Sequence, residues 1–376
     1  MALATPTALS ANSATTVTAY LADDLGVNVS AATWVGTAFG WGVLIGTPLT
    51  TSLLQTRGLR TAIAINTALV LLGAALVAAA PALPVLLVGR SIGAAGSGGL
   101  VTIAISIAGT TRRTGAITAS VGLVGAFGPL TGSVLSALSW RLPLILAAVA
   151  TLAVPSLLRR LPRTQISEAL PRDHLGIALV LGFVTAVVLI PRAPLTAIGT
   201  TTALAIALAV HIVRNGNGFV PQAVLRSRRW ITGSFAACTL STVYFVLLYT
   251  IPHLLRTQWS PDRIGLTTLL TLTCGAALAL LFTRFAQQLP AATVGIGLPA
   301  VAAVAAALPI SIATPAVYAC STALAVFASS AGMAWYATRI TEATPPLHHR
   351  TALSLYTLAY QLGGAIGPAI ATVLLT

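Results

Sequence analysis

The ten residues Thr51-Ser52-Leu53-Leu54-Gln55-Thr56-Arg57-Gly58-Leu59-Arg60 join two long apolar stretches of this 376-residue chain. They combine two arginines with a glycine, which permits a tight turn. A basic turn between two apolar helices is typical of a chain that crosses a membrane repeatedly, because loop arginines gather on the cytoplasmic side. The stretch therefore predicts a helical membrane protein whose topology is recorded by its arginines.

The composition supports a polytopic membrane protein. Hydrophobic residues make up 56% of the chain and charged residues 7%, and the mean hydropathy is +0.93. Soluble domains have about 45–50% apolar and about 25% charged residues. Apolar runs of about 20 residues are long enough to cross a hydrocarbon core, where the backbone must satisfy its own hydrogen bonds and is therefore helical. We expect an all-α protein embedded in the lipid bilayer.

The apolar runs predict thirteen spans, and many of the prolines lie in or beside the gaps between them. The expected spans are residues 3–22, 31–54, 61–80, 84–108, 115–138, 142–158, 175–190, 194–213, 231–251, 264–286, 291–310, 315–337 and 351–375.

The arginines lie mostly on one side of these spans. If the loop at Arg57 is cytoplasmic, fifteen of the 20 basic residues face the cytoplasm and four face the opposite side, which leaves Arg90 within a span. The positive-inside rule then predicts a cytoplasmic N-terminus, and we expect a multi-pass protein of the plasma membrane. The net charge of +14 is spread over short loops, which argues against a nucleic-acid partner. The four opposite arginines are Arg141, Arg192, Arg256 and Arg263.

An internal repeat indicates two homologous bundles. Gly125-Ala126-Phe127-Gly128-Pro129-Leu130 in the fifth span matches Gly364-Ala365-Ile366-Gly367-Pro368-Ala369 in the thirteenth. Two bundles related by such repeats are a common plan in secondary transporters. We expect an N-terminal six-helix bundle at 1–160, linkers with two extra helices at 161–230, and a C-terminal bundle at 231–376 that lacks its last helix.

The basic turn resembles the loop G-x-L-x-D-R-x-G-R-K that follows the second span in the major facilitator superfamily, and the chain is most similar to its fourteen-span drug/proton antiporter branch. The match covers Leu53, Gly58 and Arg60, and Arg57 lies one place from a basic residue of the family. The resemblance implies a loop that takes part in conformational switching. Gln55 stands where the family has an aspartate, so one charge partner is missing; the alternative is a plain basic turn.

The fifth span resembles the antiporter motif G-x-x-x-G-P-x-x-G-G. Its residues are Gly125, Gly128, Pro129 and Gly132, and the thirteenth span repeats the pattern at Gly363, Gly367 and Pro368. Glycines four residues apart allow close approach of two backbones, and a proline bends the helix. The resemblance implies an antiporter hinge, and simple close packing is the alternative.

Arg90 lies in a similar position to the arginine of the family pattern L-x-x-x-R-x-x-x-G, which implies a role in proton coupling. An arginine inside a span usually faces the bundle interior or an aqueous cavity, but Arg90 lies about 9 Å from Pro84 along the helix and has room to snorkel. Asp23 and Asp24 are the nearest acids. They are expected either to pair with Arg90 or to lie solvated at the end of the first span.

Polar and aromatic residues within the spans are candidates to line a substrate cavity, and interhelical packing is the alternative for each. They are Asn12, Thr16, Tyr244, Trp335, Tyr360 and Gln361. Cys238, Cys274 and Cys320 lie singly in apolar runs and are expected to be packing residues. The pattern predicts no metal site and no cofactor.

The expected function is secondary active transport. The family resemblance implies proton-coupled export of a small amphipathic drug or metabolite, as in multidrug efflux, by a chain expected to act as a monomer. No span carries paired acids or a nucleophile with a base, so an enzyme is not expected. The alternative is a degenerate or truncated family member that acts as a membrane sensor or assembly partner without transporting.

Overall fold

The computed structural model describes residues 1–108, 111–160, 173–216, 218–286, 288–345 and 348–375. The described residues form helices and short connections and contain no strand. Ten of the described helical segments are long and apolar enough to cross a membrane, and two shorter apolar helices accompany them. The prediction of an all-helical, multi-pass membrane protein is therefore confirmed.

The chain forms two compact units. Unit 1 comprises 1–170, 252–269 and 372–376, and unit 2 comprises 171–251 and 270–371. Each unit is described by itself below. Helix α12 (Pro261–Phe285) contributes to both, and the last residues of α11 (Arg228–Leu255) and α15 (His349–Leu374) also belong to unit 1.

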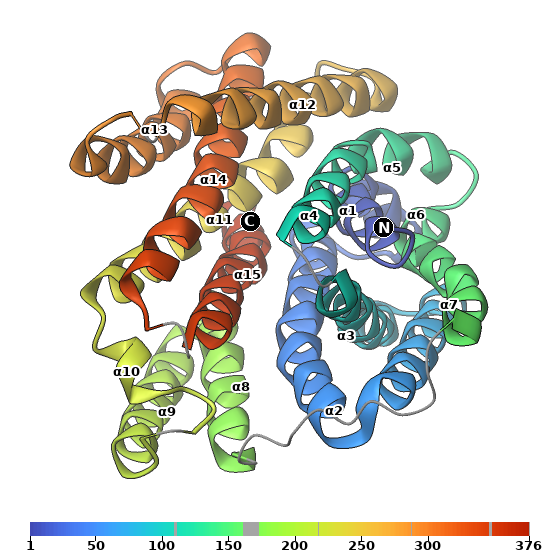
Figure 1. Ribbon diagram of the computed structural model, residues 1–376. Helices are drawn as coiled ribbons and strands as arrows, with labels where there is room; N and C mark the ends of the chain where they lie inside the picture. Colours follow the sequence, from blue (N-terminus) through green and yellow to red (C-terminus); the bar gives the residue numbers. More distant parts are fainter. Residues whose placement is uncertain (109–110, 161–172, 217, 287, 346–347, 376) are drawn as a thin grey trace. The chain divides into compact units, whose positions relative to one another are not determined.

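Unit 1 begins with α1 (Thr5–Leu25), α2 (Val29–Ala78) and α3 (Leu83–Ala108). Helix α2 covers two of the expected spans and is interrupted at Gly58, which has φ 80° and ψ 172°. This left-handed backbone is the tight turn expected from the sequence, and only glycine adopts it at little cost. The two arms of α2 lie on either side of α3 (Figure 1).

Two of the expected spans change their helical hydrogen bonding part-way along, although residues 120–136 and 141–159 each stay one apolar helical stretch. The stretch 115–138 forms α4 (Thr111–Ala126) and α5 (Gly128–Ser136), which are separated at Phe127. The stretch 142–158 forms α6 (Arg141–Ile145), a 3₁₀ helix at Leu146–Ala153 labelled η1, and α7 (Val154–Arg160). Prolines within both stretches lack the N–H that a continuous α-helix requires. Hydropathy registers apolar length and does not register these changes in hydrogen bonding.

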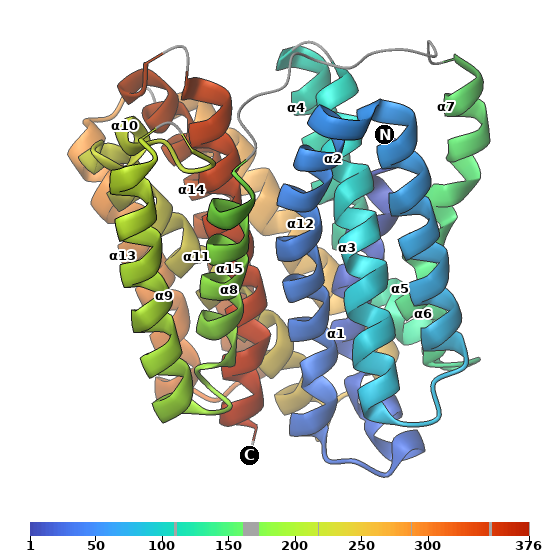
Figure 2. The same ribbon diagram turned by 90° about the horizontal axis from the view of Figure 1, so that it is seen from below.

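Unit 2 contains the helix pair α8 (His174–Leu189) and α9 (Pro194–Arg214), which lie side by side (Figures 1 and 2). A four-residue helix, α10 (Gln222–Leu225), was not expected from the sequence. The other helices are α11 (Arg228–Leu255), part of α12, α13 (Ala291–Ser311), α14 (Pro315–Ala343) and α15 (His349–Leu374).

Asp173 holds the helix pair together at one end. Its carboxylate accepts hydrogen bonds from the backbone N–H groups of Gly176 at 2.7 Å and Phe219 at 2.8 Å, and Oδ1 lies 2.8 Å from Nε2 of His211. Burial raises the pKa of Asp173, but these hydrogen bonds and the charge of His211 together hold it below its ordinary value. The N-cap of α8 is thereby joined to the last turn of α9.

Candidate functional site

The glycine face of the antiporter-like motif lies directly against α1. A Cβ atom added at Gly128 would lie 2.6 Å from Cβ of Asn12, 2.9 Å from the carbonyl oxygen of Leu9 and 2.9 Å from the backbone nitrogen of Ser13. A Cβ atom at Gly132 would meet Ser13 just as closely. No side chain fits at this seam between α1 and α5 without displacing backbone.

Two candidate cavity residues are engaged in the same seam. The amide Nδ2 of Asn12 donates to the carbonyl oxygen of Gly125 at 2.9 Å, and the hydroxyl of Thr16 donates to that of Pro129 at 3.0 Å. Residues four apart share one face of a helix, so Asn12 and Thr16 meet carbonyls that are also one turn apart. The structure places both side chains between helices, and their role in lining a cavity stays a prediction.

Unit 2 repeats this seam between α11 and α15. A Cβ atom at Gly367 would lie 2.6 Å from Cβ of Phe245, 3.0 Å from the carbonyl oxygen of Thr242 and 3.1 Å from the backbone nitrogen of Val246. At Gly363 it would meet Cys238 and Ser241. At both glycines the neighbours are the Cβ atom of one residue, the carbonyl oxygen of the residue three positions earlier and the backbone nitrogen of the residue that follows it. The sequence repeat is therefore also a structural repeat, with Phe245 in the position of Asn12.

Arg90 is buried in unit 1, with 3% of its surface exposed. Its Nη1 donates to the hydroxyl of Ser10 at 2.8 Å and to the carbonyl of Leu144 at 2.7 Å, and Nη2 donates to the carbonyl of Ser10 at 2.6 Å. The guanidinium also lies 4.4 Å from the ring centre of Phe39. The side chain faces the helices of the unit and borders a cavity of about 20 Å³, the size of one water molecule.

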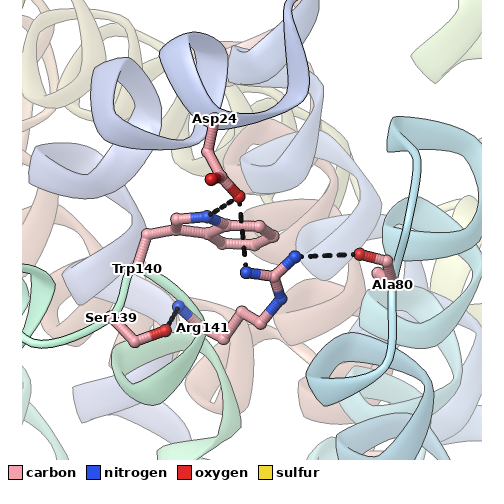
Figure 3. Close-up of polar contacts among 5 residues, drawn as sticks. All are labelled: Asp24, Ala80, Ser139, Trp140 and Arg141. Atoms are coloured by element: carbon pink, nitrogen blue, oxygen red, sulfur yellow. Dashed lines mark hydrogen bonds and ion pairs between the residues drawn. The ribbon is translucent and has the colours of Figure 1, made fainter.

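A second polar cluster joins the ends of α1 and α2 to the start of α6 (Figure 3). Asp24 accepts a hydrogen bond from the indole Nε1 of Trp140 at 2.7 Å and forms an ion pair with Arg141 at 3.4 Å. Arg141 also donates to the carbonyl of Ala80 at 3.1 Å and stacks 4.1 Å from the ring centre of Trp140. Trp140 and Arg141 thus connect the start of α6 to the ends of α1 and α2 at one end of the unit.

The expected pairing of Asp23 or Asp24 with Arg90 does not occur in this conformation. Arg90 binds Ser10, and Asp23 and Asp24 follow Ser10 on the same helix by about 20 Å at 1.5 Å per residue. Both acids are exposed. The role of these three residues in coupling stays a prediction. Either acid can interact with Arg90 only through a group that bridges the distance of about 20 Å between them.

The basic turn is anchored to the end of unit 1. Nη2 of Arg60 donates to the carbonyl oxygen of Leu158 at 3.0 Å, and Leu53 packs at the edge of the adjoining apolar core. Arg57 is exposed. The side chain of Gln55 lies outside the described residues. The turn thus links α2 to α7 through the hydrogen bond from the Arg60 guanidinium to the backbone carbonyl of Leu158.

The aromatic candidates gather on helices of unit 2. The hydroxyl of Tyr360 lies 3.0 Å from that of Ser329, and Tyr244 packs on Phe245 with ring centres 4.6 Å apart. Trp335 contacts Tyr336 edge to face. Oε1 of Gln361 is buried and has no hydrogen-bond partner among the described residues. Tyr360 and Gln361 therefore place aromatic surface next to a buried polar atom whose hydrogen bonding is unsatisfied among the described residues.

Sequence reasoning missed Ser10 and Ser329, which hold Arg90 and Tyr360. Serines are frequent in these spans, and nothing in the local pattern sets these two apart. Among the described residues, no group of three His, Cys, Asp or Glu side chains is placed to hold a metal ion.

Two units of membrane-length helices with matching seams define a polytopic membrane protein with an internal repeat. The profile of the Major Facilitator Superfamily matches residues 1–368, and the chain belongs to this family. It is therefore a secondary transporter of small molecules and not an enzyme.

Solved transporter structures share the fold of this chain. The chain is similar to a D-xylose–proton symporter, with 15% identity, a TM-score of 0.56, and coverage of 98% of this chain and 88% of that chain. A POT family transporter in complex with 5-aminolevulinic acid shares 13% identity and a TM-score of 0.65, with 99% and 90% covered. The human organic anion transporter MFSD10 shares 16% identity and a TM-score of 0.62, with 99% and 92% covered. No curated protein sequence matches the chain.

Proposed function

We propose that the protein exports a small amphipathic compound, a drug or a secreted metabolite, in exchange for protons. The observation that carries the proposal is the α1–α5 seam, where Gly125, Gly128, Pro129 and Gly132 pack on α1 around the junction of α4 and α5. The resemblance of these residues to the antiporter motif supports export, because that motif belongs to the exporting branch of the family.

Alternating access would be a movement of the bundle at 1–160 against the bundle at 231–376, with the α8–α9 pair between them in sequence. The chain would lie in the plasma membrane as a monomer with its N-terminus in the cytoplasm. The arginine distribution supports this orientation.

The proposed substrate cavity is lined in part by unit 2. Tyr360 and Gln361 on α15 and Tyr244 on α11 offer ring faces together with hydroxyl and amide groups. Ligand sites are mostly apolar with a few placed polar groups, which suits an amphipathic molecule. Trp335 on α14 adds a large aromatic surface to the same unit.

Arg90 would take part in coupling through its charge. A guanidinium stays protonated in proteins, so Arg90 cannot itself release a proton. Asp23 and Asp24 are the proposed carboxylates, and the buried positive charge would oppose the entry of a second cation near Ser10.

The test uses purified protein in proteoliposomes, compared with protein-free liposomes, and two amphipathic dyes of opposite charge, the cation ethidium and the anion fluorescein. We expect uphill movement of at least one dye when a pH gradient is imposed, and collapse of that movement by an uncoupler. If the dye moves only down its own concentration gradient and the uncoupler does not change the rate, proton coupling is contradicted. No movement of any dye, with correctly folded protein, would favour the non-transporting sensor or assembly partner.

A further inference from the structure

The junction between α4 and α5 has a specific chemical cause. Pro129 has no N–H, so the carbonyl oxygen of Gly125, four residues earlier, loses its usual helical hydrogen bond. The helix tightens at this point: the N–H of Phe127 bonds to the carbonyl oxygen of Val124, three residues earlier, at 3.1 Å, while the dihedrals of Phe127 stay right-handed helical. Gly125 is buried, and a buried carbonyl needs a replacement donor.

Asn12 supplies that donor from another helix. Its Nδ2 lies 2.9 Å from the Gly125 oxygen, and the side chain is itself part-buried. The amide contact and the 2.6 Å approach at Gly128 involve the same residue of α1. The place where the helix tightens is therefore also the place where α1 is bonded to it.

The second repeat provides an internal comparison. Pro368 corresponds to Pro129, yet α15 runs without interruption from His349 to Leu374. The residue corresponding to Asn12 is Phe245, whose ring packs 3.2 Å from the Cβ position of Gly364 and has no hydrogen-bond donor. Glycine, proline and close packing are thus common to both repeats. The side-chain donor at the freed carbonyl and the helix junction occur together in the first.

We propose that Asn12 is an interhelical tie that fixes α1 on the α4–α5 segment. Its amide replaces the hydrogen bond that Pro129 removes from the Gly125 carbonyl. This bond ties α1 to the junction of α4 and α5, so that α1 and this junction move together when the bundle bends. The proposal concerns the bending of unit 1 and does not depend on which compound is transported.

A double-mutant cycle tests the hydrogen bond. Asn12→Leu keeps the branching at Cγ and removes the donor, and Pro129→Ala returns an N–H that can bond to Gly125. We expect Asn12→Leu to lower the melting temperature of the purified protein by several degrees in the parent and by less than half as much in Pro129→Ala. Equal losses in both backgrounds would reduce Asn12 to ordinary packing and overturn the proposal.

Hydrogen exchange tests the tie to the junction, in case Pro129→Ala fails to fold. We expect Asn12→Leu to speed amide exchange at residues 124–131 by at least about tenfold, which corresponds to about 1.4 kcal/mol. Exchange in α15 should not change. Phe245→Leu is the matched control in the second repeat and should leave residues 124–131 as in the parent. Unchanged exchange at 124–131 in Asn12→Leu, or an equal rise throughout the protein, would refute the tie.

Discussion

Gly128→Ala is the smallest change that tests the α1–α5 seam. The new methyl group would lie 2.6 Å from Cβ of Asn12 and 2.9 Å from two backbone atoms of α1, where ordinary contact begins near 3.4 Å. The helices must therefore separate by about 0.8 Å. The same shift would lengthen the Asn12–Gly125 hydrogen bond from 2.9 Å to about 3.7 Å, beyond a hydrogen bond's range.

The expected cost follows from these two effects. Overpacking a close contact costs about 1–3 kcal/mol, and the lost hydrogen bond adds about 1 kcal/mol. Gly122→Ala is the matched control, because Gly122 lies on the preceding helix, α4, six residues before Gly128, and a Cβ atom there meets nothing within 4 Å. Alanine in an open helix position should be neutral or should stabilise by up to about 1 kcal/mol.

Both variants should be unfolded by titration with SDS in mixed micelles, with helix content followed by circular dichroism. We expect a lower midpoint for Gly128→Ala than for the parent, and a parent-like or higher midpoint for Gly122→Ala. If Gly128→Ala is as stable as Gly122→Ala, the seam is looser than the structure shows, and the packing role of the motif is refuted.

Three further predictions concern the charged groups. Arg90→Ala should abolish uphill dye export at normal membrane abundance, and Arg90→Lys should restore it only in part, because an ammonium cannot reproduce the forked contacts to Ser10; full export by Arg90→Ala would exclude a coupling role. Asp173→Asn should lower the SDS midpoint near pH 6, and parent and variant should converge as the pH falls below about 4, because a carboxylate with a lowered pKa stabilises the fold only while it is ionised; a difference that persists at low pH would contradict this. Trp140→Ala should cost about 3–5 kcal/mol and Arg141→Gln at most about 1 kcal/mol, because the indole is buried whereas the Arg141–Asp24 pair is part-exposed; the SDS midpoints in the reverse order would refute this ranking.

The helices themselves could be predicted from hydropathy, but the places where their hydrogen bonding changes could not. Gly125–Pro129 and Gly364–Pro368 are nearly identical in sequence, yet the first contains the junction of α4 and α5 and the second lies within α15. Pro48, Pro299 and Pro309 also lie inside continuous helices. A proline removes one hydrogen bond in each case, and the outcome depends on the groups that neighbouring helices bring to the freed carbonyl. That information is tertiary.

The site shows the same limit. The small residues of the motif predicted a close approach, because any neighbour can use the space they leave. The identity of the neighbour was not predictable, because the polarity of Asn12 and Thr16 suits both a cavity lining and a hydrogen bond to another helix. For Arg90, charge favoured an acid as partner, but a guanidinium has five donors that neutral oxygens can also satisfy, as Ser10 and Leu144 do.

The two seams share a backbone distance but differ in the chemistry that opposes their separation. Opening the α1–α5 seam would break the hydrogen bonds of Asn12 and Thr16, each worth about 1 kcal/mol within a membrane protein, and would leave backbone carbonyls in an apolar medium. Opening the α11–α15 seam at Phe245 would separate apolar surfaces that lipid tails can cover nearly as well as protein can. Hydrogen bonds also have a narrow range of distance and angle, whereas apolar surfaces slide. Glycine therefore sets how close the helices come in both repeats, and Asn12 adds a hydrogen bond at the motif itself, whereas the α11–α15 hydrogen bond of Trp230 to Ala352 lies away from Phe245.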